Sequence, residues 1–311
     1  MIGNFLTVTQ QVAVLCVLIG IGALMRLTHL LTPGSVEGLV NLLILVVTPC
    51  LIVDVFQRPF DPSMLKGLGF AFLIGVAVHV AAIAAAHLAV WQKDESVRRP
   101  LLLSAVFSNA GFMGIPLEQA LLGDGGVFYG IVYVVVFNLF IWSWGIRTMG
   151  GTGCLGYGNL KMWVNPGTVG IALGLPLFLL SVRLPAVMGV PVHLLAGLNT
   201  PLAMIVIGYC LVGAKLGRVV RIGAVFVATA LRLIAFPLAL IAALYPFRAA
   251  LDRNLMLAVV IAASAPVAAM VSMFASKYGR DVEVSVAVVS GTTLLSVLTM
   301  PLVIALAMAV L

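Results

Sequence analysis

Long apolar runs recur along the entire chain, separated by short segments that carry most of its charge, glycine and proline. Of the 311 residues, 63% are hydrophobic and 9% are charged, and the mean hydropathy is +1.22. No single soluble core could bury this much apolar surface. A bilayer core about 30 Å thick takes about 20 apolar residues per helix. The sequence therefore predicts an all-α polytopic membrane protein.

Charge, glycine and proline divide the chain into ten predicted transmembrane helices. They cover residues 11–28, 38–56, 67–91, 100–122, 126–146, 165–182, 197–214, 223–246, 255–277 and 284–310. No Lys or Arg precedes Arg26, so the N-terminus lacks the basic region of a cleavable secretory signal. We therefore expect the first span to be retained.

Lys and Arg are unevenly divided between the two sides of this topology. One side collects eleven: Arg26, Lys93, Arg98, Arg99, Arg147, Lys161, Lys215, Arg218, Arg221, Lys277 and Arg280. The other collects five: Arg58, Lys66, Arg183, Arg248 and Arg253. Because positive loops resist translocation, the first side is predicted to be cytoplasmic. We expect a multi-pass protein of the cell (inner) membrane with both termini non-cytoplasmic.

The polar residues exclude several other functions. The net charge of +7 is spread over short loops and forms no basic stripe, which argues against nucleic acid as a partner. The four cysteines form no CxxC motif or Cys/His pair at metal spacing, so no metal site is expected. No nucleophile and base pair, P-loop or dinucleotide-binding motif is visible. We expect no enzyme activity and no cofactor.

The order of the spans predicts two related halves. Residues 1–150 hold five spans, residues 163–311 hold five more, and a glycine-rich cytoplasmic joint at 151–162 connects them. An odd number of spans inverts the second half relative to the first, as in many transporters. A shift of 156 positions places "SNAGFMGIPLEQALLGD" (Ser108 to Asp124) over "SAPVAAMVSMFASKYGR" (Ser264 to Arg280).

Both of these segments interrupt an apolar run with proline and small residues. In a bilayer, a helix break is costly unless protein, water, an ion or a substrate pairs with the freed backbone groups. A half-helix that begins near Ile115 and Pro116 would direct free amides and a positive dipole end toward the break, which suits an anion. The alternative is that Gly111, Gly114 and Pro116 only kink a packed span.

Four motifs carry a resemblance to a known family: "NAGFMGIPL" in the fourth span, "NPGT" in the sixth, "TPCLIVDVF" in the second and "FASKYG" in the ninth. Over essentially the whole chain they resemble the auxin efflux carrier family, which includes the plant PIN-FORMED carriers and bacterial malonate-type permeases. The resemblance implies a ten-helix fold like that of the bile acid sodium symporters. Helices one, two, six and seven would form a scaffold. The other six would form a moving domain in which the broken fourth and ninth helices cross beside the substrate, with elevator-like transport.

The same resemblance implies a substrate-binding site. Asn109 and Pro116 match an asparagine and a proline of the fourth-helix crossover, and Pro266 matches the proline at the start of the ninth-helix break. Asn165 matches the sixth-helix asparagine that approaches substrate in the plant carriers. The predicted substrate-binding set is Asn109, Ala110, Gly111, Pro116, Asn165, Ser264 and Pro266. Val271 replaces a second proline of the plant ninth-helix motif, which argues against auxin itself as the substrate.

Three residues are candidates for coupling transport to an ion. Glu118 is a carboxylate at membrane depth, where it is a candidate proton carrier or cation ligand or, alternatively, a residue that stabilises the first turn of its half-helix. Arg232 lies inside the eighth span, where it could pair with Glu118, with an anionic substrate or with a structural partner. Ser272, with Ser264, Ser276, Thr292 and Thr293, could supply oxygens to a sodium site, although small hydroxyls also serve helix packing.

These observations favour a secondary transporter of small organic anions, mono- or dicarboxylates, embedded in the lipid bilayer. Coupling to H⁺ or Na⁺ and assembly as a homodimer are both compatible with the sequence. The alternatives are a sodium-coupled symporter resembling the bile acid carriers, and an intramembrane enzyme.

The charge bias makes a testable prediction about orientation. In a variant without the native cysteines, single cysteines near Gly151 and Arg218 should be protected from an impermeant thiol reagent in intact cells. Cysteines near Gly3 and Arg183 should be labelled, because these positions are expected to face outward. Labelling in the reverse pattern would refute the orientation.

Overall fold

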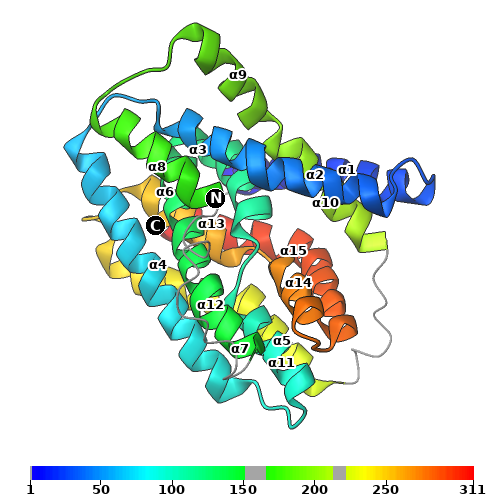
Figure 1. The fold of residues 1–311 in the computed structure, drawn as a ribbon. Helices are drawn as coiled ribbons and strands as arrows, with labels where there is room; N and C mark the ends of the chain where they lie inside the picture. The colour runs from blue at the N-terminus through cyan, green and yellow to red at the C-terminus, as the bar shows by residue number, and fades with distance from the viewer. Residues whose placement is uncertain (1, 151–165, 213–221) are drawn as a thin grey trace.

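The computed structural model describes residues 2–150, 166–212 and 222–311, and the side chains within these ranges except those of 2–9, 11 and 12 (Figure 1). Every regular element in these ranges is a helix. The whole of the predicted glycine-rich joint at 151–162, and also Asn165, lie outside the described residues.

The helices of the first half follow the predicted spans in order. They are α1 (Ile2–Leu27), α2 (Pro33–Leu42), η1 (Leu43–Val47), α3 (Thr48–Phe56), α4 (Pro62–Ala89), α5 (Glu95–Val106), η2 (Ala110–Gly114), α6 (Ile115–Phe140), η3 (Ile141–Gly145) and α7 (Ile146–Gly150). Polar caps begin several helices in the chain: side-chain oxygens of Thr32, Asp61, Asp94, Asp252 and Asp281 accept hydrogen bonds from first-turn amides. These amides have no partner within the helix, so the caps fix where each helix begins.

The described helices of the second half follow in chain order. They are α8 (Pro166–Leu179), α9 (Ala186–Gly197), α10 (Asn199–Val212), α11 (Gly223–Ala230), η7 (Leu231–Ala235), α12 (Phe236–Leu244), η8 (Tyr245–Phe247), α13 (Arg253–Ser264), α14 (Met270–Lys277) and α15 (Val282–Val310). The π-helical turns η1, η2 and η7 each end two residues before a proline: Pro49, Pro116 and Pro237. A proline lacks an amide and clashes with the carbonyl four residues earlier, and a wider turn accommodates both effects.

Six helical stretches in the described residues are long and apolar enough to cross a membrane. They are Pro33–Phe56, Pro62–Ala89, Ala110–Gly150, Ala186–Val212, Gly223–Phe247 and Val282–Val310, and shorter apolar helices cover Ala13–Leu27, Pro166–Leu179 and Arg253–Ser264. Large apolar side chains such as Leu88, Trp91 and Val187 are more than four-fifths exposed at 85%, 87% and 87%. The prediction of a polytopic membrane protein is confirmed. The count of ten helices remains a prediction.

One span boundary differs from the sequence prediction. The seventh span was placed at 197–214, but the helix begins at Ala186, because α9 and α10 join end to end through Leu198. The fourth and fifth spans are predicted as separate segments at 100–122 and 126–146, and Gly123 does interrupt the helical conformation between them, with φ/ψ of 63°/−159°. The stretch from Ala110 to Gly150 therefore consists of two helices that meet at this glycine, and the start of the fourth span lies in α5.

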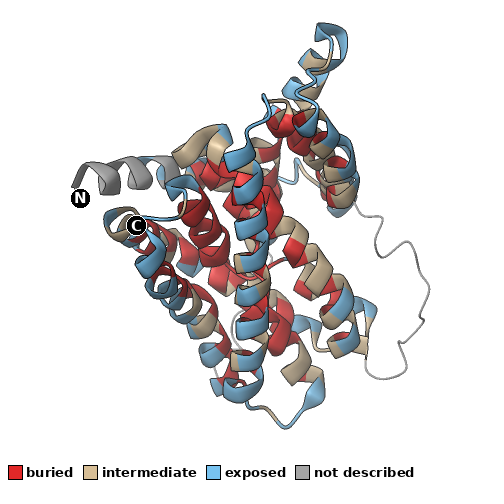
Figure 2. Ribbon diagram, turned by 90° about the vertical axis from the view of Figure 1, so that its left-hand side faces the viewer, coloured by how far each residue is buried: buried red, intermediate tan, exposed pale blue. Residues whose placement is uncertain are grey.

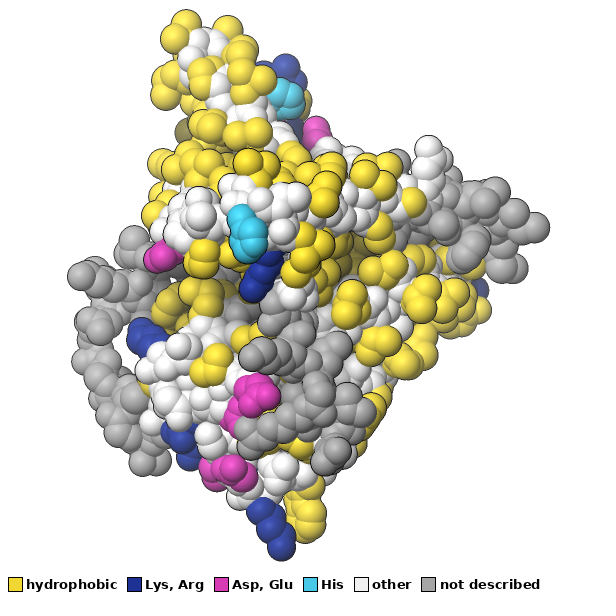
Figure 3. All heavy atoms as spheres, turned by 90° about the vertical axis from the view of Figure 1, so that its right-hand side faces the viewer, with side chains coloured by type: hydrophobic (Ala, Val, Ile, Leu, Met, Phe, Trp, Pro, Cys, Tyr) yellow, Lys and Arg dark blue, Asp and Glu magenta, His cyan; other side chains and the backbone are white. Residues whose placement is uncertain are grey.

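Buried residues line the faces where helices meet, and exposed residues cover the outside (Figure 2). α1 packs chiefly against α10, and α3 packs against α8 and α9, whereas α6 packs against α4 and α13. Apolar side chains cover much of the face shown in Figure 3, where charged groups are scattered. A surface of this kind suits a hydrocarbon environment.

Gly123 and Gly279, which the 156-residue shift aligns, both have a positive φ angle. Their φ angles are 63° and 61°, in the left-handed region that favours glycine. The alignment does not hold as well at its other end. Ser264 is the last residue of α13, whereas Ser108 lies two residues beyond Val106, the end of α5. The 156-residue alignment of the two segments is therefore two residues out of register where the breaks begin.

Replacing Gly123 or Gly279 by alanine should lower stability by about 1–2 kcal/mol, because the left-handed conformation is costly for residues with a Cβ atom. A Cβ at either position meets no atom within 4 Å, so backbone strain alone would act. Gly69→Ala is the control, since Gly69 lies in α4 with equally open surroundings and no positive φ. Thermal unfolding in detergent measures the effect. Equal melting temperatures for all three variants and the unmodified chain would contradict the prediction.

Candidate functional site

Two helices are interrupted inside the protein, and their interruptions lie against each other. α5 ends at Val106 and α13 ends at Ser264, and the next residues, Phe107 and Ala265, are extended with φ/ψ of −99°/113° and −62°/148°. Ser108 and Val267 then form an antiparallel bridge. The two broken helices therefore cross at these segments, which we call the crossing (residues 107–109 and 265–268).

The crossing supplies partners for several of its own backbone groups. The amide of Asn109 donates to the carbonyl of Pro266 at 2.6 Å, and the amide of Ala268 donates to the carbonyl of Phe107 at 3.0 Å. The amide of Val267 donates to Oγ1 of Thr292 on α15 at 3.2 Å. The sequence argument required partners at each break. For these three amides they come from the protein itself, without a ligand.

The helix after the first break begins earlier than expected. Asn109 precedes the π-helical turn η2, and its carbonyl accepts from the amides of Met113 at 2.9 Å and Gly114 at 3.3 Å. The helix end at the crossing is therefore Ala110, and the expected start near Ile115 and Pro116 is wrong by five residues. The missing amide of Pro116 is accommodated by η2 instead of lying at the helix end.

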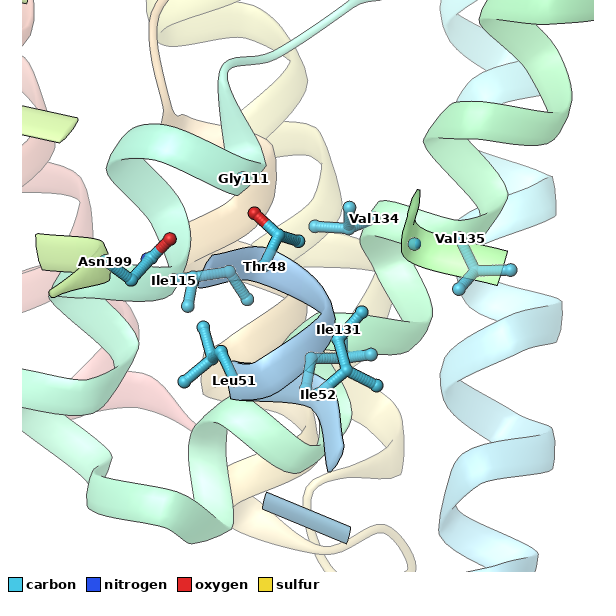
Figure 4. A pocket seen from close by; sticks show the side chains of 10 residues that line it. Thr48, Leu51, Ile52, Gly111, Ile115, Ile131, Val134, Val135 and Asn199 are labelled. Carbon is cyan, nitrogen blue, oxygen red and sulfur yellow. The ribbon is translucent and has the colours of Figure 1, made fainter. Parts of the chain in front are cut away.

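A small cavity of about 20 Å³ lies beside this helix end (Figure 4). Its lining is mostly apolar and comprises Thr48, Leu51, Ile52, Gly111, Ile115, Ile131, Val134, Val135, Gly167 and Asn199. Thr48, Leu51 and Ile52 come from α3. Gly167 comes from α8 and Asn199 from α10, and the remaining lining residues come from η2 and α6. A space of this size accommodates about one water molecule. A carboxylate could enter only if these helices moved apart.

Thr48 and Asn199 were not among the predicted site residues, although they bring polar side chains to this cavity (Figure 4). A sequence signal was available. A Thr-Pro dipeptide occurs at Thr48 and again at Thr200, next to Asn199, in the second and seventh predicted spans. Comparing the two halves for this dipeptide would have indicated both positions.

The predicted substrate-binding residues lie close together where they are described. Asn109 is 7% exposed and Ala110 1%, Gly111 lines the small cavity, and Pro266 bonds to Asn109. Ser264 is buried, but its hydroxyl donates to the carbonyl of Ile261 within its own helix at 2.9 Å.

Glu118 is fully buried, and neither of its carboxylate oxygens has a hydrogen-bond partner in the described residues. Its carboxylate packs against Gly130, where a Cβ atom would overlap it. An ionised carboxylate without partners is costly in such surroundings, so burial favours the protonated form. The alternative role, stabilising a first helical turn, is weakened because Glu118 lies eight residues beyond Ala110.

Arg232 is 1% exposed and lies on η7. Its guanidinium donates to the carbonyl of Val106 at 2.8 Å and to the carbonyl of Ala263. The suggested ion pair with Glu118 is wrong: the ion pairs in the described residues do not include it. The guanidinium faces the ends of α5 and α13, whereas the carboxylate faces Gly130.

The hydroxyls proposed for a sodium site serve different partners. Thr292 and Thr293 donate to carbonyls of their own helix, those of Val288 at 2.8 Å and Val289 at 2.7 Å. The hydroxyl of Ser272 is buried and has no partner among the described residues. The same part of the chain holds no cluster of three or more His, Cys, Asp or Glu residues suited to a metal ion.

A second, larger cavity of about 440 Å³ lies near the start of α4 and α13. Its lining includes Asp61 and Asp252 and one basic residue, Lys66. Two carboxylates disfavour an anion there, so this cavity is a poorer candidate for an anion site than the crossing.

Comparison with known proteins gives one family. A family model described as "Membrane transport protein" matches the chain twice, over residues 7–154 and 152–304. None of the curated proteins compared with the chain matches it.

Proposed function

The chain belongs to the membrane transport protein family, the family of the auxin efflux carriers, and we propose that it is a secondary transporter of small organic anions, mono- or dicarboxylates. The observation that carries this proposal is the crossing. Two broken helices place their ends at one buried point, where backbone dipoles can act on a ligand.

The helix ends at the crossing favour an anion. η2 begins at Ala110 and α14 begins at Met270, and neither first turn contains an acidic residue. Helix N-termini carry a partial positive charge of about half an elementary charge each and present free amides. The amide side chain of Asn109 would add a neutral donor beside them.

An elevator-like mechanism is supported by how the helices pack. α3, α8 and α10 form one wall of the small cavity, and η2 with α6 forms the other. The contact is mostly apolar, so sliding would break few hydrogen bonds. The two family matches in tandem and the positive φ angles of both Gly123 and Gly279 support a ten-helix, inverted-repeat arrangement.

Glu118 is our candidate for proton coupling, because its carboxylate lacks both an ion pair and a hydrogen bond among the described residues. Such a group can take up and release a proton when its surroundings change. Sodium coupling, as in a symporter resembling the bile acid carriers, is the second candidate. The hydroxyl of Ser272, which has no hydrogen-bond partner within the described ranges, is the observation in its favour.

Purified protein in sealed liposomes tests the function directly. A labelled carboxylate should accumulate when a proton gradient is imposed and should leak out when the gradient collapses. Conversion of substrate to product without sealed vesicles would instead favour an intramembrane enzyme. Accumulation that needs sodium and ignores the proton gradient would favour the sodium symporter.

Asn109→Ala should weaken carboxylate binding by about 1–3 kcal/mol, the usual cost of leaving a buried polar group unmatched. The fold should survive, because the backbone of Asn109, not its side chain, makes the bond to Pro266. Ligand-induced thermal stabilisation measures the affinity, and the melting temperature without ligand is the internal control. Carboxylate binding by the variant at the level of the unmodified protein would show that Asn109 does not contribute to the site.

Glu118→Gln keeps the shape of the side chain but fixes it in a neutral form. If Glu118 carries the proton, exchange of substrate between equilibrated sides should continue, whereas accumulation driven by a pH gradient should be lost. Loss of both activities, or of neither, would indicate that Glu118 only supports the helix. Full pH-driven accumulation by the variant excludes the carrier role.

A further inference from the structure

Arg232 is a permanently charged group that is buried without an acidic partner in the described part of the chain. An isolated charge in such a place is strongly disfavoured unless other groups compensate it. Its compensation must therefore come from neutral groups with oriented dipoles, and the hydrogen bonds show which ones they are.

Both acceptors of the guanidinium are carbonyls at the ends of broken helices. Val106 is the last residue of α5, and Ala263 is the last but one of α13. The final carbonyls of a helix have no partner within it. A helix C-terminus carries about −0.5 elementary charge. Two such ends add up to about −1, which matches the charge of one guanidinium.

The shape of the side chain matters as much as its charge. A guanidinium directs several N–H groups outward in a rigid plane, so that one group can bond two separate carbonyls. A lysine ammonium is a compact point charge on a flexible stem. Arg232 thus links the two helix ends, and its Nε makes no hydrogen bond within the described residues.

The polar side chains beside Arg232 include Tyr133 and His79, and no acidic side chain in the described residues pairs with it. The hydroxyl of Tyr133 faces the guanidinium. Ser108, a residue of the crossing, lies beside Tyr133. Both residues are buried, and neither hydroxyl has a fully formed hydrogen bond in the described residues. The guanidinium therefore remains the dominant charge at this end of the crossing.

We propose that Arg232 is the built-in cation of the transport site. It cancels the negative ends of α5 and α13 in the place where a bound metal ion would otherwise be needed. The positive ends of η2 and α14 are then left to attract the carboxylate. This inference rests on the proposed function. Arg232 is a positioning residue, because it acts on the substrate through the helix ends it neutralises.

Two substitutions separate charge from packing. Arg232→Lys keeps the charge but loses the rigid plane of N–H groups. Arg232→Met keeps much of the volume but loses the charge. Carboxylate affinity should fall about tenfold or more in the Met variant, a change of about 1.4 kcal/mol, and less in the Lys variant. Both should melt at a lower temperature. Arg26→Met is the matched control, since Arg26 also donates to a helix carbonyl, that of Tyr209 at 2.8 Å, but away from the crossing.

The carboxylate affinities of the variants show whether Arg232 acts through its charge or through packing. Equal affinity losses in the Lys and Met variants would show that Arg232 serves packing only. Unchanged affinity in the Met variant would overturn the proposal, as would sodium-dependent carboxylate binding by the unmodified protein. A Met variant that cannot be purified, beside a Lys variant that can, supports the need for a charge.

Chemical rescue gives a readout that does not depend on transport. Arg232→Gly should leave a space that free guanidinium fills, so millimolar guanidinium chloride should raise the melting temperature of this variant but not that of Arg26→Gly. Sodium chloride at equal concentration is the control. If the unmodified protein binds no carboxylate, the proposed function fails, and guanidinium-specific rescue still decides whether Arg232 is the cation. Rescue by both salts alike would overturn the assignment.

Discussion

The pairing of backbone groups in a low-dielectric environment governs this structure. A helix satisfies its own amides, and any interruption inside a membrane must find partners elsewhere. Here two interruptions satisfy each other: Asn109 bonds to Pro266, and Ala268 bonds to Phe107. Thr292 of α15 completes the arrangement by accepting from Val267. The crossing therefore provides hydrogen-bond partners for both breaks, and it also brings together helix ends that can act on a ligand.

Two ionisable side chains are buried near this point, and their surroundings differ. Arg232 has backbone carbonyls as partners, whereas the carboxylate of Glu118 packs against Gly130 and has no hydrogen-bond partner among the described residues. A guanidinium cannot lose its charge in a protein, so it must be compensated in place. A carboxylic acid can become neutral, so it can remain without partners. The contrast supports a fixed role for the first and a changing role for the second.

Much of this arrangement could be predicted from the sequence. Apolar runs indicated the membrane helices, and the repeated proline and small residues indicated both breaks. The start of the helix at Ala110 could not be predicted, because the π-helical turn depends on the backbone geometry before Pro116. The partner of Arg232 was also missed, since sequence patterns show charged side chains but not which backbone carbonyls lack partners. Thr48 and Asn199 required contacts between distant helices.

The hydrogen bonds of Arg232 bear on how the two halves of the chain are related. Each half matches the same family, so the halves share a common design. One arginine of the second half nevertheless bonds to helix ends from both halves, and the third predicted span of the first half, residues 67–91, contains no arginine. The two halves therefore differ at this point. A chain assembled from two copies of the first half would form neither of these bonds.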